Sequence, residues 1–185
     1  MFVVTVRCNQ KCTYCHASSQ DETSGISNDM DSKTARKRVE MVFKSPSSNI
    51  KIEFQGGEPL LNFEIIKEVV EYAVELNNDF QKIIEFVICT NLVNLNSTHV
   101  EFIKKHNIII STSLDGSRNI HNKCRKLRNG KGSYDYVVSN LEWLKSELDY
   151  GRVNALMTVT PHNVFCINEV IDEYISKDLF RLYFY

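Results

Sequence analysis

The sequence is poor in the features that mark membrane, secreted or fibrous proteins. It contains only three prolines and seven glycines in 185 residues, and it has no low-complexity tract. No apolar run approaches the roughly 20 residues that a transmembrane helix needs. The segment from Met1 to Arg7 is too short for a secretory signal and carries its charge at the wrong end. We therefore expect a cytoplasmic globular protein that makes no membrane contact.

A dominant charge of either sign is also missing. The chain has 22 Lys and Arg against 23 Asp and Glu, so its formal net charge is −1, and its sequence pI is near 6.5. Proteins that bind nucleic acid usually carry a basic excess, so no nucleic-acid partner is expected. Hydrophobic residues make up 43% of the chain, which is enough for the core of one domain over residues 1–185.

The six cysteines are too few for a disulfide scaffold in a chain of this length, and their distribution suggests metal binding instead. Three of them lie within eight residues, whereas the other three are isolated along the chain. The clustered cysteines are Cys8, Cys12 and Cys15. In a reducing compartment such a cluster indicates a metal site more often than a disulfide.

Short runs rich in Val, Ile, Phe and Thr alternate with segments whose apolar residues recur at helical spacing. The predicted strands are Phe2–Arg7, Ile50–Gln55, Ile83–Thr90, Asn107–Leu114, Arg152–Val159 and Arg181–Tyr185. Helical patterns cover residues 33–44, 66–73, 137–148 and 167–174. The alternation predicts repeated strand–helix–strand units, and hence an α/β fold with a parallel sheet of strands that are buried on both faces. Periodicity alone leaves open whether this sheet curls as an open barrel or is doubly wound.

The cysteine triplet has the spacing C-x3-C-x2-C. Four ligands close a structural zinc site, and four thiolates hold an ordinary ferredoxin cluster. Three thiolates with no obvious fourth leave one coordination position of a [4Fe–4S] cluster free to bind a small molecule. His16 and Cys124 are the candidates for a fourth protein ligand, so a zinc site or a passive electron-transfer cluster remains an alternative.

Further motifs with unusual residues follow the predicted strands. They are Q-G-G-E-P at 55–59, C-T-N at 89–91, S-L-D-G at 113–116 and I-H-N-K-C-R at 120–125. Adjacent glycines permit positive φ and a close approach of the backbone to a ligand. Because the carboxyl ends of parallel strands share one edge of a sheet, we expect these motifs to meet there, beside the cysteine triplet.

Together, the cysteine spacing and these motifs resemble the signature of radical S-adenosylmethionine (SAM) enzymes. Within that superfamily the sequences of these motifs are similar to those of the SPASM-type peptide and protein maturases, such as the anaerobic sulfatase maturases and the maturase of His-Xaa-Ser systems. The resemblance covers Arg7 to about Thr160 and implies a partial (β/α)6 barrel. Since those relatives carry a further cysteine-rich domain, it also implies that this chain is the barrel portion only, truncated at the C-terminus.

The resemblance also implies the cofactors and their contacts. A [4Fe–4S] cluster on the triplet would bind SAM and, when reduced, cleave it to methionine and a 5′-deoxyadenosyl radical that abstracts a hydrogen atom. The residues expected to contact SAM or shield the cluster are Tyr14, Gly56, Gly57, Glu58, Asn91, Ser113 and Arg125. Leu92 departs from the family pattern, in which a glycine often follows the Thr-Asn pair. No catalytic base or hydrogen donor is predicted.

The resemblance implies two partners, a peptide or protein substrate and an external electron donor of the flavodoxin or ferredoxin type. Two rival interpretations remain at this stage. One is a non-enzymatic domain that binds zinc or an electron-transfer cluster, and the other is an inactive barrel remnant.

Overall fold

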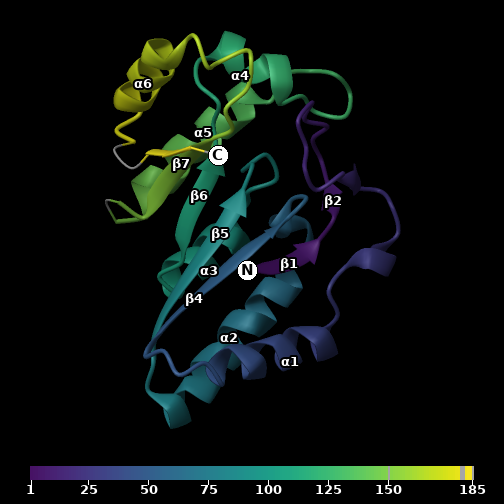
Figure 1. Ribbon diagram of the computed structural model, residues 1–185, viewed down its shortest axis with the longest axis vertical. Coiled ribbons are helices and arrows are strands. Elements are labelled where there is room, and N and C mark those ends of the chain that lie inside the picture. The colour runs from purple at the N-terminus through teal and green to yellow at the C-terminus, as the bar shows by residue number, and fades with distance from the viewer. Residues whose placement is uncertain (150, 180–181, 185) are drawn as a thin grey trace.

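A six-stranded parallel sheet is the centre of the computed structural model, which describes residues 1–149, 151–179 and 182–184. Its strands are β1 (Phe2–Thr5), β4 (Asn49–Gly56), β5 (Ile83–Thr90), β6 (Ile109–Ser113), β7 (Val153–Met157) and β8 (Leu182–Phe184). They lie across the sheet in this same order (Figure 1). Each strand therefore pairs with its neighbour in the chain, whereas a doubly wound sheet reverses its order at a switch point. This order confirms the predicted α/β class and matches an open barrel.

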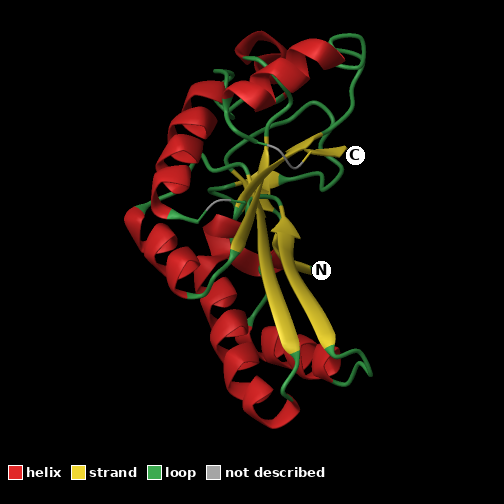
Figure 2. Cartoon of the chain, turned by 90° about the vertical axis from the view of Figure 1, so that its left-hand side faces the viewer, coloured by secondary structure: helices red, strands yellow, loops and turns green. Residues whose placement is uncertain are grey.

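Helices connect the successive strands. They are α1 (Ser32–Phe43), α2 (Phe63–Phe80), α3 (Ser97–Lys105), α4 (Arg118–Cys124), α5 (Tyr134–Glu147) and α6 (Ile167–Ser176), with the short 3-10 helices η1 (Ile26–Asn28) and η2 (Pro59–Asn62). In Figure 2 the longer helices run along one side of the strands. The strand–helix–strand connections share one handedness, and each new strand is added at the same edge of the sheet. The connecting helices therefore lie on the same side of the sheet. Among the described residues no helix combines the length and the apolarity required to cross a membrane.

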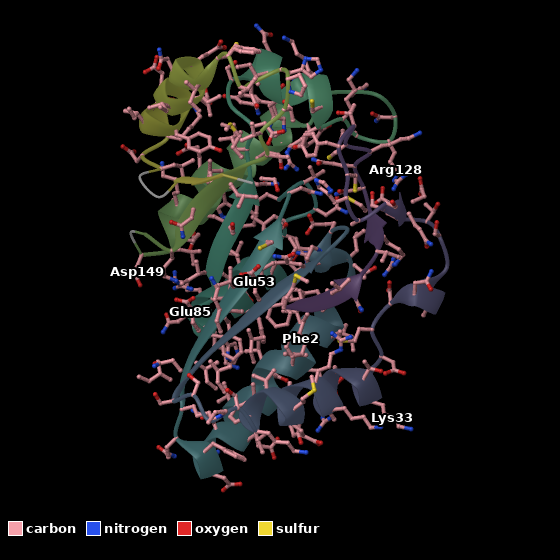
Figure 3. All side chains as sticks on the ribbon, in the orientation of Figure 1. Phe2, Lys33, Glu53, Glu85, Arg128 and Asp149 are labelled. Atoms are coloured by element: carbon pink, nitrogen blue, oxygen red, sulfur yellow. The ribbon has the colours of Figure 1, made fainter. Side chains whose placement is uncertain are left out.

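The two faces of the sheet differ in chemistry, as β4 illustrates. Ile50, Ile52 and Phe54 are buried in the core, whereas Lys51 and Glu53 alternate with them and line a cavity on the opposite face. Figure 3 shows Glu53 and Glu85 on this second face. The prediction of strands buried on both faces is therefore wrong for β4. Its strict alternation is the pattern of a strand with one packed face and one open face.

The first predicted strand divides in two. The register of β1 against β4 shifts between Val3 and Thr5, and β1 ends at Thr5. The next two residues form β2 (Arg7–Cys8), which pairs with β3 (Gln20–Asp21) in a separate two-stranded sheet. This change of partner carries the chain out of the main sheet and into the loop that holds the cysteine triplet.

Two other predicted strands need adjustment at their ends. The strand predicted from Asn107 begins at Ile109, because Asn107 has a φ of 52°, which a strand does not accommodate. Of the strand predicted at Arg181–Tyr185, Arg181 and Tyr185 lie outside the described residues. The three residues between them form β8, which pairs with β7 in parallel.

Candidate functional site

The cysteine loop, which we define as residues 8–20, forms one wall of a cavity of about 850 Å³. Cys8 is 6% exposed at the end of β2, and Cys12 and Cys15 are partly buried in the loop that follows. All three are free thiols, and all three line the cavity. The rest of the lining includes the carboxyl ends of β4, β5 and β6 and residues of β7. The predicted meeting of the strand ends with the triplet is therefore present in the structure.

A second segment, residues 124–132, packs against the cysteine loop, and we call it the clasp. The backbone N–H of Lys11 donates to the carbonyl of Lys126 at 2.8 Å, and that of Thr13 donates to the carbonyl of Cys124 at 3.1 Å. Backbone bonds of this kind satisfy N–H groups that would otherwise be unpaired in an irregular loop. The path of the cysteine loop therefore depends on residues far along the chain.

Arg128 adds a side-chain anchor between the clasp and the cysteine loop. Its Nε donates to the carbonyl of Cys8 at 2.7 Å, and its Nη2 donates to the carbonyl of Ser19 at 3.0 Å and to that of Gln20. The same guanidinium lies 3.4 Å from the carboxylate of Asp21. A planar guanidinium can donate several bonds in a fixed geometry, so Arg128 ties both ends of the cysteine loop together.

The environment of the thiols suits an iron–sulfur cluster. The backbone N–H of Gln10 donates to Cys8 Sγ at 3.4 Å, and Asn91 Nδ2 lies 3.7 Å from the same sulfur. Two buried side-chain donors beside the triplet, Asn9 Nδ2 and Gln10 Nε2, have no hydrogen-bond partner among the described residues. Buried unpaired N–H groups are rare, and thiolate and sulfide sulfurs are acceptors that would satisfy them. The donor set therefore fits the predicted cluster.

A closed site for a single ion is not found in the described part of the chain. There, no group of three His, Cys, Asp or Glu side chains is arranged to hold one metal ion. His16 is exposed, and Cys124 is buried at the end of α4. A four-iron cluster is larger than one ion, so its three thiolates need not converge on a single point.

The protonation of the thiols varies with their surroundings. Burial raises the pKa of Cys8 to about 12, and the carboxylate of Glu58 adds to this rise. Burial also raises the pKa of Cys12, although Arg125 opposes the shift. For Cys15 burial acts in the same direction, but hydrogen bonds from residues 17–19 outweigh it and lower the pKa. A metal must therefore displace a firmly held proton from Cys8, and metal loading should release protons.

Glu58, one of the residues predicted to contact SAM or shield the cluster, has its carboxylate occupied by contacts within the protein. Its carboxylate is fully buried and is absent from the cavity lining. It accepts hydrogen bonds from Thr90 Oγ1 at 2.7 Å, from the N–H of Asn91 at 2.7 Å and from the N–H of Leu60 at 3.1 Å. Burial nevertheless raises its pKa. We therefore assign Glu58 to the support of the loops that end β4 and β5, and the lining role to Gly56 and Gly57.

The glycines at the end of β4 are required by their neighbours in β1 and β2. Gly56 has a φ of 141°, and a Cβ there would lie 2.0 Å from the carbonyl oxygen of Thr5. A Cβ on Gly57 would lie 2.2 Å from the carbonyl oxygen of Arg7. The N–H of Gly57 in turn donates to Thr5 O at 2.9 Å. We predicted that these glycines allow a close approach of the backbone to a ligand. In the structure they already allow a close approach of the end of β4 to the backbone of β1 and β2.

Gly57→Ala should lower the free energy of unfolding by about 1–3 kcal/mol, the usual cost of forcing an atom into occupied space. The obstructing atom is backbone, so it cannot rotate away as a side chain would. Urea unfolding measures the loss. The matched control is Gly25→Ala, where an added Cβ meets nothing within 4 Å and stability should hardly change. Equal stability of the two variants would contradict this packing argument.

Leu92, at the position where the family pattern often has a glycine, adopts a backbone conformation that favours glycine. Its φ is 61°, in the left-handed region, and its side chain is fully buried in the core. Its N–H donates to Thr90 Oγ1 at 3.0 Å, and its carbonyl accepts from Asn140 Nδ2 at 2.7 Å. The left-handed turn costs a leucine roughly 1–2 kcal/mol. Burial of the side chain offsets that cost, so a leucine is tolerated in this left-handed turn.

Asp115 lies at the centre of a buried polar cluster beside the cavity. Its carboxylate is 3.1 Å from Arg125 Nε, with the two side chains 2% and 9% exposed. It also accepts the hydroxyl of Tyr14 and, at 3.2 Å, the N–H of Thr158. One side chain thereby joins the end of β6, the cysteine loop, the clasp and the end of β7. Sequence analysis included Asp115 in a motif but gave it no role.

Arg125 and Tyr14, two predicted site residues, face the cavity from this cluster. The guanidinium carbon of Arg125 is 5.3 Å from the centre of the Tyr14 ring. Burial lowers the pKa of Arg125, but Asp115 and Tyr14 outweigh it and raise the pKa overall. Burial also raises the pKa of the Tyr14 hydroxyl. Arg125 therefore remains a cation on the cavity wall.

His121 holds the segment between Asp115 and Arg125 in place. Its Nδ1 accepts from the N–H of Asp115 at 3.4 Å, so the ring proton belongs on Nε2, which lies 3.0 Å from Ser133 Oγ. The Ser133 hydroxyl donates onward to the carbonyl of Arg125 at 2.8 Å. Burial lowers the pKa of His121 to about 3, and Arg125 adds to the shift. His121 is therefore a neutral structural residue.

The face of the sheet that lines the cavity, which we call the inner face, contributes polar residues that sequence analysis did not name as site residues. Cys89 pairs in register with Ser111, and Ser111 pairs with Asn154. These three, with Gln55, line the cavity. The thiol of Cys89 faces the cavity and donates to Glu53 Oε1 at 3.7 Å. The signal was present in β4, where polar and apolar residues alternate.

Comparison with known proteins agrees with this architecture. The family model described as the Radical SAM superfamily matches residues 2–173. An uncharacterized protein of Methanocaldococcus jannaschii is 36% identical over 144 residues, which cover 77% of this chain and 47% of that protein. A cysteine-type anaerobic sulfatase-maturating enzyme of Clostridium novyi is 28% identical, with 94% of this chain and 46% of the relative covered. The chain thus spans about half the length of these relatives.

Solved structures that are similar to this chain also match nearly all of it and about half of their own length. The structure described as native anSMEcpe with bound AdoMet superposes with a TM-score of 0.84 at 26% identity, covering 98% of this chain and 49% of that one. The same protein with bound AdoMet and Kp18Cys peptide gives a TM-score of 0.85 at 26% identity, with 98% and 48% covered.

Proposed function

Because the chain belongs to the radical SAM superfamily, we propose that it holds a [4Fe–4S] cluster on Cys8, Cys12 and Cys15 and binds SAM in the adjoining cavity. The observation that supports this most strongly is that the three thiols and the ends of three strands surround one cavity. When bound and reduced, the cluster supplies the electron that cleaves SAM into methionine and a 5′-deoxyadenosyl radical. Fold and function then agree, since ligands of parallel α/β sheets bind at the carboxyl ends of the strands.

The chain's own residues would bind and orient SAM. Gly56 and Gly57 bring backbone to the cavity wall, and Ser113 and Asn91 bring polar side chains. Asn91 is held by a 2.8 Å hydrogen bond from its Nδ2 to Asn9 Oδ1. Arg125 supplies a buried cation suited to the carboxylate of SAM. Asp115 and Glu58, which do not line the cavity, support these groups from behind.

We further propose a peptide or protein substrate. The inner face offers a row of uncharged donors and acceptors, from Gln55 through Cys89 and Ser111 to Asn154, on the wall of the same cavity. Such groups can bind a polypeptide side chain or its amides without demanding a particular charge. A similar structure at 26% identity and a TM-score of 0.85 contains a peptide together with AdoMet.

The proposal also includes an external one-electron donor of the flavodoxin or ferredoxin type, because the proposed chemistry requires a reduced cluster. A cytoplasmic setting is proposed as well. All six cysteines are free thiols, and a reducing compartment would keep them so.

The test is anaerobic reconstitution with iron and sulfide, followed by reduction with dithionite in the presence of SAM and assay of 5′-deoxyadenosine by mass spectrometry. We expect the wild-type chain to produce 5′-deoxyadenosine and Cys12→Ala to produce none. Loss of one thiolate removes a ligand from the cluster that the other two cannot replace.

Cys166→Ala is the matched control, since it removes a cysteine that lies at the start of α6, away from the cavity lining. It should produce 5′-deoxyadenosine as the wild type does. Tight binding of zinc by four protein ligands, or equal production by Cys12→Ala, would show that the proposal is wrong. A cluster that forms but leaves SAM intact would favour an inactive remnant.

A further inference from the structure

Positive charge is concentrated around the clasp, although the whole chain has a net charge of −1. From Arg118 to Tyr134 there are six Lys and Arg and no Asp or Glu. This stretch of 17 residues therefore holds more than a quarter of the chain's 22 basic side chains. Such a local excess creates a positive potential that attracts acidic partners even when the protein as a whole is close to neutral.

Only some of these charges are used inside the protein. Arg125 pairs with Asp115, Arg128 pairs with Asp21, and Arg118 pairs with Asp135. Four exposed lysines near them form no ion pair among the described residues, and we call them the basic face. They are Lys11, Lys123, Lys126 and Lys131. Their charges are therefore available to a partner.

The basic face is joined to the cysteine loop. Lys11 belongs to that loop and is bonded through its backbone to Lys126, which in turn forms a backbone bridge with Gly132, next to Lys131. Arg128, labelled in Figure 3, anchors the same segment to the carbonyls of Cys8 and Ser19. The lysines are consequently carried on segments fixed to the backbone that bears the cluster ligands.

The basic face does not belong to the substrate cavity. Of the clasp and the lysines around it, only Arg125 lines the cavity. The lysines are exposed outside it. The polar row proposed to bind the peptide substrate lies on the inner face of the sheet inside the cavity, so the exposed charges of the basic face are poorly placed to bind its reacting end. They are well placed for a protein that must come close to the cluster without entering the cavity.

We propose that the basic face is the docking surface for an acidic one-electron carrier of the flavodoxin or ferredoxin type. The inference rests on the proposed function, because only a reducible cluster requires such a donor. In each encounter the carrier is oxidised by one electron, and that electron reduces the bound cluster. A few exposed lysines suit this task, since redox partners form small transient interfaces guided by complementary charge.

The test uses the double variant Lys126→Glu/Lys131→Glu and an acidic flavodoxin as probe. The first measurement is the affinity of the flavodoxin for the metal-free chain. Anaerobic stopped flow then measures the rate at which the reconstituted protein oxidises the flavodoxin hydroquinone. We expect binding and association rate to fall about tenfold or more at low salt. The difference from wild type should nearly vanish at about 0.5 M salt, where screening shortens the reach of charge to a few ångströms.

The matched control is Lys33→Glu/Lys37→Glu, which makes the same change in charge on exposed residues of α1, at the far end of the molecule (Lys33 in Figure 3). It should leave flavodoxin binding close to wild type. Dithionite, which needs no docking surface, should support SAM cleavage equally in all three proteins. Failure of wild type with dithionite would refute the proposed function, whereas the binding comparison tests the docking surface separately.

Equal loss of flavodoxin binding in both double variants would overturn the inference, because it would show a general effect of net charge. Unchanged binding in Lys126→Glu/Lys131→Glu would also overturn it. A polyglutamate peptide provides the remaining comparison. If that variant lost peptide binding but kept flavodoxin binding, the basic face would serve an acidic segment of the substrate instead.

Discussion

Asp115→Ala should lower the free energy of unfolding by about 3–5 kcal/mol, the usual cost of breaking a buried ion pair from one side. The change leaves the Arg125 guanidinium, whose side chain is 9% exposed, without its counter-charge. It also removes the acceptor for the Tyr14 hydroxyl and for the N–H of Thr158. Urea unfolding at neutral pH, analysed with a common m-value, measures the loss.

Two further variants define the origin of this loss. Asp135→Ala breaks an ion pair with Arg118 whose side chains are 59% and 61% exposed, and it should cost less than about 1 kcal/mol. Asp115→Asn keeps an oxygen acceptor but removes the charge, so its stability should lie between wild type and Asp115→Ala. If Asp115→Ala were no more harmful than Asp135→Ala, the buried cluster would not hold the cavity wall as described.

Acidification should destabilise the protein through His121. The folded-state pKa of about 3 lies below the ordinary value of 6.5, so the unfolded chain binds the proton more tightly than the folded one. Neutral His121 therefore contributes to the stability of the folded state above pH 6.5, and this contribution is lost as the pH falls from 6.5 toward 3. Its size is about 4–5 kcal/mol at most, since each pKa unit corresponds to 1.36 kcal/mol. The free energy of unfolding measured between pH 7 and pH 4 should show this decline.

His121→Gln provides the comparison, because its amide can accept from the N–H of Asp115 and donate to Ser133 but takes up no proton in this range. Its stability should depend less steeply on pH than that of wild type. Part of the slope will remain, since burial also lowers the pKa of His99, to about 4. Identical slopes in wild type and His121→Gln would exclude His121 as the titrating group.

The order of the elements and the place of the site could be predicted because they depend on local patterns. Apolar runs such as Ile83–Thr90 marked the strands, and all the motifs followed strand ends, where parallel sheets bind ligands. The resemblance to radical SAM enzymes is confirmed by the family model that matches residues 2–173. The roles of the cysteine triplet and the SAM contacts remain predictions that rest on that resemblance and on the shared cavity.

What could not be predicted depends on contacts between distant residues. Nothing near Glu58 in the sequence indicates that Thr90 and Asn91 would occupy its carboxylate. Arg128 lies 120 residues from Cys8 in the sequence, and only the folded chain brings it to the carbonyl of Cys8. Cys89 belongs to a largely apolar run, yet the pleat turns its side chain to the cavity.

The clasp also has a consequence for the order of events during synthesis. The cysteine triplet leaves the ribosome well before Arg128, which binds the carbonyl of Cys8 and follows it 120 residues later. Until then the loop lacks the partners that fix its path, and its thiols are open to oxidation or to stray metal ions. We expect iron and sulfur to be inserted only after the chain has grown past the clasp.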